Sequence, residues 1–158
     1  MSLNIRRVVT GHDPSGKAVV TIDEVAGNVR PLREGASATV IWSTQGFPVD
    51  NTEMLDGAQR PVATSHADGT VFRVIEYAPG VAPRNHRTDS IDYAVVLSGS
   101  IDMVLDGTTV RLKAGDVLVQ RGTIHDWVNS GPDPCVIAFV LIAAKPVTIE
   151  GKPLHAVG

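Results

Sequence analysis

Short runs of β-forming residues, interrupted throughout by turn residues, most constrain what this chain can fold into. The 158 residues include 15 glycines and 10 prolines, and no stretch has the apolar periodicity of an amphipathic helix of three turns. This spacing is typical of an all-β sandwich or barrel. The runs that we expect to form strands are residues 6–10, 18–23, 39–43, 70–77, 92–97, 101–105, 110–113, 117–120, 124–129 and 135–144.

The length of the chain fits one domain with a single substantial core. We expect residues 1–67 to form N-terminal strands and a loop that pack on a barrel, within the same domain. Residues 68–145 would form the barrel core, and residues 146–158 an irregular tail. Residues 24–37 are expected to be a loop, and residues 45–63 a surface loop or lid that could contain one short helical turn.

Charge and composition narrow the classes of partner. Lys plus Arg number 14 and Asp plus Glu 17, so the net charge of −3 argues against nucleic acid or an anionic membrane surface as the partner. The longest apolar run, residues 135–144, is too short to cross a bilayer as a helix. One cysteine allows no intrachain disulfide, and the first residues lack a secretory signal, so we expect a cytoplasmic location.

Four polar residues alternate along the segment that leads into the strand over 92–97. His86, Thr88, Ser90 and Asp92 are spaced two apart, so in an extended chain their side chains share one face. A polar face that continues into a buried strand indicates a lined cavity. A second histidine, His125, follows about one hairpin later, and we expect the two segments to face each other.

The first of these segments has the spacing of a known motif, in which Gly, five residues, His-x-His, three or four residues, Glu, six residues and Gly follow in order. The chain has Gly80, His86, Thr88, Asp92 and Gly99 at those positions. Every spacing is kept, whereas threonine replaces the second histidine and aspartate replaces the glutamate.

The second segment resembles the partner motif, which reads Gly, five residues, Pro-x-Gly, two residues, His, three residues, Asn. Here Gly115, Gly122, His125 and Asn129 match, although the proline is absent and the first half is one residue shorter. With both motifs in order, residues 79–129 resemble the cupin superfamily, specifically the small single-domain cupins. The resemblance implies an all-β double-stranded β-helix, the RmlC-like jelly-roll barrel, with extra strands at the N-terminus.

The resemblance also implies a metal site, because cupins of this type commonly hold a divalent transition metal. Carried over by position, the ligands are His86, Asp92 and His125, the same three residues that we expect to be catalytic. Two imidazoles and a carboxylate suit Fe, Mn, Ni or Zn. Thr88 occupies a ligand position but is a poor ligand when neutral, so we expect it to contact substrate. The alternative is that the loss of one ligand has abolished metal binding.

Side chains beside the motifs are further candidates for binding a small-molecule ligand. Trp127 and Tyr93 flank the histidine and aspartate positions and could form a stacking wall, although a barrel aromatic is more often part of the core. Arg84 could clamp a carboxylate or enolate, and Arg87 and Arg121 also lie next to the motifs. A surface or salt-bridge role is the alternative for each arginine.

We therefore expect a small-molecule enzyme that catalyses a metal-assisted oxygenation, decarboxylation or isomerisation of a small carbonyl or carboxylate compound. Two alternatives remain open: a non-catalytic small-molecule-binding cupin, and a metal-free acid-base lyase or isomerase. The family resemblance also implies a homodimer, with the N-terminal strands around residues 5–23 as candidates for an exchanged edge.

Overall fold

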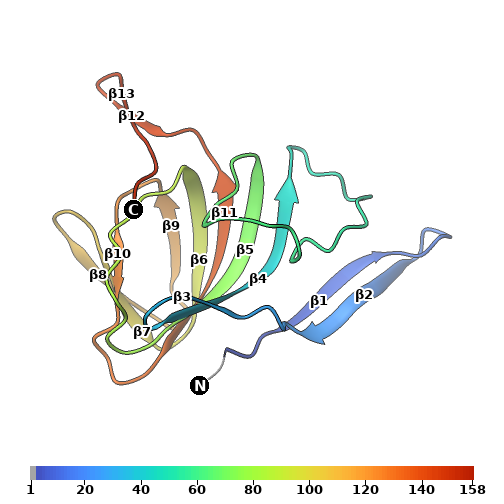
Figure 1. Cartoon of the computed structure of the whole chain (residues 1–158), viewed down its shortest axis with the longest axis horizontal. Helices are drawn as coiled ribbons and strands as arrows, with labels where there is room; N and C mark the ends of the chain where they lie inside the picture. Colours follow the sequence, from blue (N-terminus) through green and yellow to red (C-terminus); the bar gives the residue numbers. More distant parts are fainter. Residues whose placement is uncertain (1–2) are drawn as a thin grey trace.

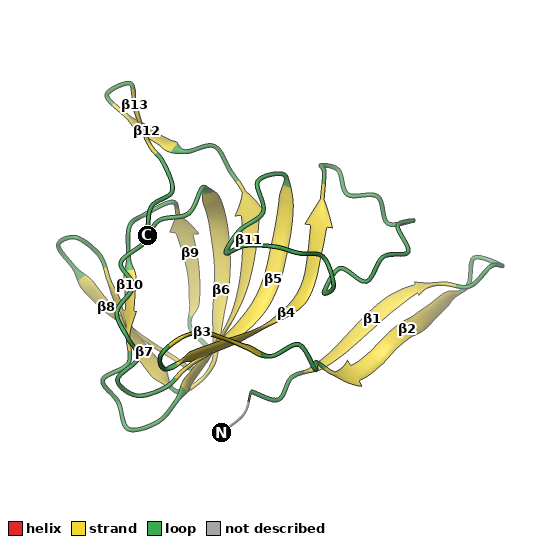
Figure 2. Ribbon diagram, in the orientation of Figure 1, coloured by secondary structure: helices red, strands yellow, loops and turns green. Residues whose placement is uncertain are grey.

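The computed structural model describes residues 3–158, which form thirteen β-strands and no helix (Figures 1 and 2). Residues 3–158 therefore offer no helix that could cross a membrane. The strands are β1 (Arg6–His12), β2 (Ala18–Val25), β3 (Arg30–Arg33), β4 (Ala36–Gln45), β5 (Gly69–Tyr77), β6 (Ser90–Ser98), β7 (Ser100–Val104), β8 (Thr109–Lys113), β9 (Val117–Arg121), β10 (Asp126–Val128), β11 (Cys135–Ala143), β12 (Val147–Ile149) and β13 (Lys152–Leu154).

Two antiparallel sheets make the barrel. The larger has six strands in the order β3-β4-β5-β11-β6-β9, and the smaller has three in the order β10-β7-β8. Neighbours in the larger sheet are far apart in sequence, since β11 lies between β5 and β6. Figure 1 shows the two sheets facing each other across the interior. The all-β jelly roll predicted from the sequence is confirmed.

Alternation along the strands separates the core from the outer surface. In β11, Ile137, Phe139 and Leu141 are at most 5% exposed, whereas the residues between them are only partly buried. The inner face of β5 carries Val71 and Ile75, which pack in the same cluster. Burying one such side chain stabilises the fold by roughly 1.5–3 kcal/mol. Because a slip of one residue would turn these side chains to the outer face, the strands with the strictest alternation determine the register of the barrel.

The N-terminal region differs from the sequence expectation in two ways. Residues 24–37 are not a continuous loop, because they contain β3 and the start of β4, which extend the larger sheet. The hairpin of β1 and β2 pairs only with itself and projects away from the barrel (Figure 1). Its base is held by the buried guanidinium of Arg7, which contacts Glu24 and Asp56 at 2.6 Å each. The homodimer expected through these strands stays a prediction.

The C-terminal region is ordered, so the prediction of an irregular tail over residues 146–158 is wrong. Strands β12 and β13 form a hairpin, and Val157 then pairs with Arg87 through two backbone hydrogen bonds of 2.8 and 3.0 Å. This pairing brings the end of the chain next to the segment that carries His86. The loop over residues 46–68 contains turns and no helix, so the helical turn allowed there is absent from it.

Candidate functional site

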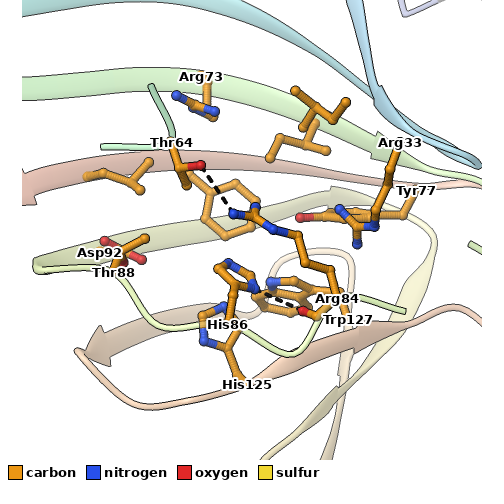
Figure 3. Close-up of a pocket in the computed structure, with 14 residues that line it drawn as sticks. Arg33, Thr64, Arg73, Tyr77, Arg84, His86, Thr88, Asp92, His125 and Trp127 are labelled. Carbon is orange, nitrogen blue, oxygen red and sulfur yellow. Dashed lines mark hydrogen bonds between the residues drawn. The ribbon is translucent and has the colours of Figure 1, made fainter. Parts of the chain in front are cut away.

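A cavity of about 360 Å³ opens between the two sheets, with apolar and ionisable side chains on its wall (Figure 3). Strands β3, β5, β6, β10 and β11 contribute residues to it, together with the segments around Thr64, Arg84 and His125. Its lining comprises Leu32, Arg33, Thr64, Arg73, Ile75, Tyr77, Arg84, His86, Thr88, Asp92, His125, Trp127, Phe139 and Leu141. The two predicted motifs therefore meet at one cavity, as their order in the sequence predicts.

His86 and His125 are paired by the backbone as well as by their rings. The amide of each donates to the carbonyl of the other, at 2.9 and 3.0 Å, in an isolated antiparallel bridge. Their ring centroids are 4.3 Å apart (Figure 3). Each Nδ1 lies 2.9 Å from a backbone carbonyl, that of Arg84 for His86 and that of Thr123 for His125. A neutral imidazole that donates from Nδ1 leaves the lone pair on Nε2 free as an acceptor.

Burial keeps both imidazoles uncharged. His125 is 3% exposed, and its pKa is lowered to about 4, mainly because the charged form would lose its hydration. The pKa of His86 is also lowered, again with burial as the largest cause. The neighbouring His86 also lowers the pKa of His125, and the positive charges of Arg84 and Arg33 lower that of His86. Near pH 7 the pair is therefore a set of two neutral hydrogen-bonding groups.

Asp92 has the opposite behaviour, because burial favours its protonated form. The carboxyl is on the inner face of β6 and 5% exposed, and burial raises its pKa to about 6. Ser90 Oγ lies 2.6 Å from Asp92 Oδ1 and 2.7 Å from Thr88 Oγ1, forming a chain of three oxygens. When Asp92 is ionised, Ser90 donates to it and Thr88 donates to Ser90. A carboxyl with a pKa this close to neutrality can both accept and return a proton.

The predicted metal ligands do not form a three-residue centre. Throughout residues 3–158, no three His, Cys, Asp or Glu side chains lie close enough together to hold a metal ion. The two imidazoles are adjacent, but Asp92 is turned to Ser90 and threonine stands at the third ligand position. Two neutral nitrogens without a nearby anionic oxygen do not fit the ligand sets that transition-metal sites use. This geometry does not assemble His86, Asp92 and His125 into one ligand set, and metal binding by these residues stays a prediction.

Among the predicted substrate contacts, Arg84, Thr88 and Trp127 line the cavity. The Arg84 guanidinium donates to an oxygen of Gly158 at 2.9 Å. It also lies 3.4 Å from the hydroxyl of Thr64 (Figure 3), and these two contacts position it. Trp127 is 2% exposed, and its ring meets those of His125 and Phe139 edge-on at 5.8 and 5.6 Å. It belongs to the core and to the cavity wall at once.

Tyr93 is not part of the site. It is 49% exposed and absent from the cavity lining, because strand alternation turns it to the outer face of the larger sheet while Asp92 points inward. The prediction of a substrate contact at Tyr93 is therefore wrong. Successive side chains of a strand point to opposite faces, so a residue next to the inward-facing Asp92 should face outward.

Four polar residues of the cavity were missed by the sequence analysis: Arg33, Thr64, Arg73 and Tyr77. Arg73 and Tyr77 share the inner face of β5 with Val71 and Ile75. The signal was present in the sequence, because alternation in TVFRVIEY puts one arginine among the apolar positions of a buried strand face. Arg33 carried no such signal, since its segment was expected to be a loop.

Residues 73–142 match the family model described as Cupin domain. The chain is 36% identical over 157 residues to the cupin-domain-containing oxidoreductase fogC of Aspergillus ruber, an alignment that covers 94% of this chain and 77% of that protein. It is 39% identical over 162 residues to the phomopsin biosynthesis cluster protein C' of Diaporthe leptostromiformis, covering 96% and 85%. The polyketide cyclase RemF of Streptomyces resistomycificus shares the fold, with a TM-score of 0.52 at 18% identity over 77% of this chain and 79% of that one. This chain belongs to the cupin family.

Proposed function

We propose that this protein is a small-molecule cupin enzyme that moves a proton at a carbon next to a carbonyl group. One arrangement carries the proposal: the buried carboxyl of Asp92, whose pKa burial raises, lines the same cavity as two adjacent imidazoles whose pKa values burial lowers. Titratable groups whose pKa values are driven in opposite directions within a cavity are typical of acid-base sites. The cavity volume of about 360 Å³ suits a compact organic substrate.

In this reaction the ionised Asp92 is the base. Its oxygen takes a proton from the activated carbon, and the electron pair of the C–H bond moves toward the carbonyl oxygen to give an enolate. The guanidinium of Arg84, which lines the cavity, stabilises the negative charge on that oxygen. The protonated Asp92 then returns the proton at the same or a neighbouring carbon, so the cycle is redox-neutral and needs no other reactant.

His86 and His125 have a binding role in this scheme. With each Nδ1 on a backbone carbonyl, each Nε2 offers an acceptor for a hydroxyl or N–H of the substrate. Accepting a full proton would put a charge on a buried ring, which the low pKa of His125 opposes. The pair therefore orients the substrate beside Asp92, and no step passes through a metal because the three-ligand set is not assembled.

A second function is favoured by the relative from Aspergillus ruber, which is described as an oxidoreductase. An enolate is electron-rich and is the form of a carbonyl compound that gives up electrons most readily. Oxidation would then follow the same proton removal by Asp92, with an external acceptor such as dioxygen receiving the electron pair. The two functions share their first step and differ in whether the acceptor is consumed.

Proton exchange with solvent tests the proposal without knowledge of the natural substrate. A panel of small 2-oxo acids and 1,3-dicarbonyl compounds is incubated with the protein in D₂O, and loss of the signal of the activated proton is followed by NMR. We expect exchange above the buffer rate for at least one compound, lost in Asp92→Asn and kept in Asp102→Asn, whose carboxyl pairs with Arg111 outside the cavity. Exchange that persists in Asp92→Asn contradicts the role of Asp92.

Oxygen uptake, measured on the same panel with an electrode, separates the two functions. Exchange without uptake supports the redox-neutral reaction, and uptake that depends on Asp92 supports the oxidoreductase. Absence of both from the whole panel contradicts the enzyme proposal and favours a non-catalytic small-molecule-binding cupin.

A further inference from the structure

Two guanidinium groups on the cavity wall lack a carboxylate partner. Arg73, on β5, is 6% exposed, and its Nη2 donates to the carbonyl of Ala63. Arg33, on β3, donates from Nε to the carbonyl of Ala82 at 2.8 Å and lies over the ring of Tyr77 at 5.8 Å. Neither guanidinium is within ion-pair distance of an acidic side chain in the part of the chain that the structure describes.

Both groups also carry polar atoms that the fold leaves unsatisfied. The Nε of Arg73 and the Nη2 of Arg33 are buried with no hydrogen-bond partner in the protein. A buried charge is costly unless it is paired and hydrogen-bonded, and arginine is retained in such positions where a carboxylate or phosphate is recognised. The arrangement is therefore incomplete without an anion.

The balance of charge in the cavity leads to the same conclusion. The guanidinium groups of Arg33 and Arg73 line it with a single acidic side chain, Asp92, while that of Arg84 is hydrogen-bonded to an oxygen of Gly158. The two histidines add no negative charge. A neutral ligand would leave this excess positive charge uncompensated in a largely buried space, whereas an anionic ligand would neutralise part of it.

We propose that Arg73 anchors an anion-binding subsite that holds a carboxylate of the substrate, with Arg33 as a second free guanidinium of the same cavity, an inference that rests on the proposed function. Register positions the subsite relative to Asp92. Arg73 pairs with Phe139 of β11, and Phe139 pairs with Ala94 of β6. Asp92 lies two residues before Ala94 on β6, so Arg73 and Asp92 are on the same inner face of the larger sheet. A substrate carboxylate on Arg73 leaves the rest of the molecule directed along the wall toward Asp92.

A carboxylate is a better match than a larger anion. The wall beside Arg73 includes the apolar side chains of Phe139 and Leu141 on the neighbouring strand β11, so the part of the ligand next to its carboxylate meets apolar surface. A planar carboxylate can take two parallel hydrogen bonds from one guanidinium. The substrate class is therefore a small carbonyl compound with a carboxylate at one end and an apolar or planar body.

Binding of inert probes tests this subsite apart from catalysis. Benzoate and benzamide have nearly the same shape and differ in charge, and neither has an activated proton. By calorimetric titration at pH 7.5, we expect wild-type protein to bind benzoate at least tenfold more tightly than benzamide. Arg73→Met should weaken benzoate binding at least tenfold and change benzamide binding less than twofold. Arg111→Met, which removes the same charge from an exposed site, should change neither more than twofold.

Arg33→Met and Arg73→Lys provide a second route if Arg73→Met does not fold. Arg33→Met should also weaken benzoate selectively, and Arg73→Lys should retain part of the preference because it keeps the charge and loses the paired N–H groups. Equal affinity for the two probes in the wild type, or benzoate binding that is unchanged in both methionine variants, overturns the subsite.

The Asp92→Asn variant separates this inference from the proposed function. It should keep the preference for benzoate while losing proton exchange. If the wild type catalyses no exchange and still binds benzoate through Arg73, the subsite stands and the proposed enzyme reaction fails. If exchange occurs and depends on Asp92 while benzoate shows no dependence on Arg73 or Arg33, the reaction stands and the subsite fails.

Discussion

His86 and His125 hold each other in place through reciprocal backbone hydrogen bonds of 2.9 and 3.0 Å, and their rings lie 4.3 Å apart at the cavity wall. The bridge joins the two motif segments, so the position of either ring depends on the other. Since both Nδ1 atoms lie 2.9 Å from backbone carbonyls, the rings present their Nε2 atoms as acceptors. The site therefore combines a fixed neutral pair with one titrating carboxyl, Asp92.

The rate of the proposed reaction should depend on pH through Asp92. The base must be ionised, and burial raises the pKa of Asp92 to about 6. We expect kcat/KM for any substrate found in the exchange panel to rise about tenfold per pH unit below pH 6 and to level off above it. A profile that is flat between pH 5 and 7, on protein shown to stay folded there, contradicts the assignment of Asp92 as the base.

The hydroxyl of Ser90 should tune that pH dependence. Its hydrogen bond of 2.6 Å to Asp92 stabilises the ionised carboxylate and lowers a pKa that burial raises. In Ser90→Ala we expect the acidic limb of the pH–rate profile to move to higher pH, so that the plateau begins at a higher pH than in the wild type. Val95→Ala on the outer face of the same strand is the matched control and should leave the profile in place. A limb that stays fixed in Ser90→Ala shows that the hydroxyl does not act on the base.

Stability should respond to pH in opposite directions in two variants. Burial lowers the pKa of His125 to about 4, so the stability that this residue contributes above pH 6.5 is lost as the pH falls toward 4. Burial raises the pKa of Asp92 from 3.8 to about 6, so the stability from its protonated form is present below pH 4 and is lost as the pH rises through 6. Each shift corresponds to about 3 kcal/mol at most.

Urea unfolding between pH 4 and 7.5 measures these two effects as differences from wild type. Asp92→Asn should gain stability relative to wild type as the pH rises through 6, because the buried charge is gone. His125→Gln should gain relative stability as the pH falls from 6.5 to 4, because no proton then binds preferentially to the unfolded state. If the difference in unfolding free energy between each variant and the wild type does not change with pH, Asp92 and His125 are not buried in their uncharged forms.

Gly99, the last glycine of the first motif, should tolerate no side chain. Its φ is +73°, and a methyl group there would overlap the backbone carbonyl of Pro134. We expect Gly99→Ala to lower the free energy of unfolding by at least about 2 kcal/mol, from the left-handed backbone and the overlap together. Gly107→Ala, at an open turn position with no neighbour within 4 Å, should change it by less than about 0.5 kcal/mol. Equal effects of the two substitutions contradict a steric role for Gly99.

Alternation and turn residues predicted an all-β sandwich or barrel, and the resemblance of the two motifs to the cupins predicted the jelly roll. The central strands obey a strict period of two, as β11 does with Ile137, Phe139 and Leu141 inward, so the pattern determines which face is buried. The strands of the β1–β2 hairpin were also predicted, over residues 6–10 and 18–23, but the separation of this hairpin from the barrel was not. Most residues of β2 are exposed on both faces, so neither face carries an apolar pattern that shows what it packs against. The C-terminal hairpin was not predicted. Strands β12 and β13 have three residues each, which is too short for periodicity to be detected.

The site was predictable where the chain is extended and where spacing alone decides which residues meet. The alternation of Thr88 and Asp92 placed both at the cavity, and the two histidines meet as their motifs predict. The ligand set was not predictable, because it depends on the direction in which the Asp92 carboxyl turns. Arg73 was missed because a charged residue on a buried face was not weighed as a signal, and Arg33 because its strand forms only through pairing with β4.

The titration of the Asp92 carboxyl is the most direct test of this account, because it needs no substrate. The ¹³Cγ shift of Asp92, assigned by comparison with Asp92→Asn and followed by NMR in the presence of a chelator, should change with a midpoint near pH 6. A midpoint near 4, the value of an ordinary solvated aspartate, would contradict the account, since Asp92 would then be a weaker base that is hardly ever protonated near neutral pH.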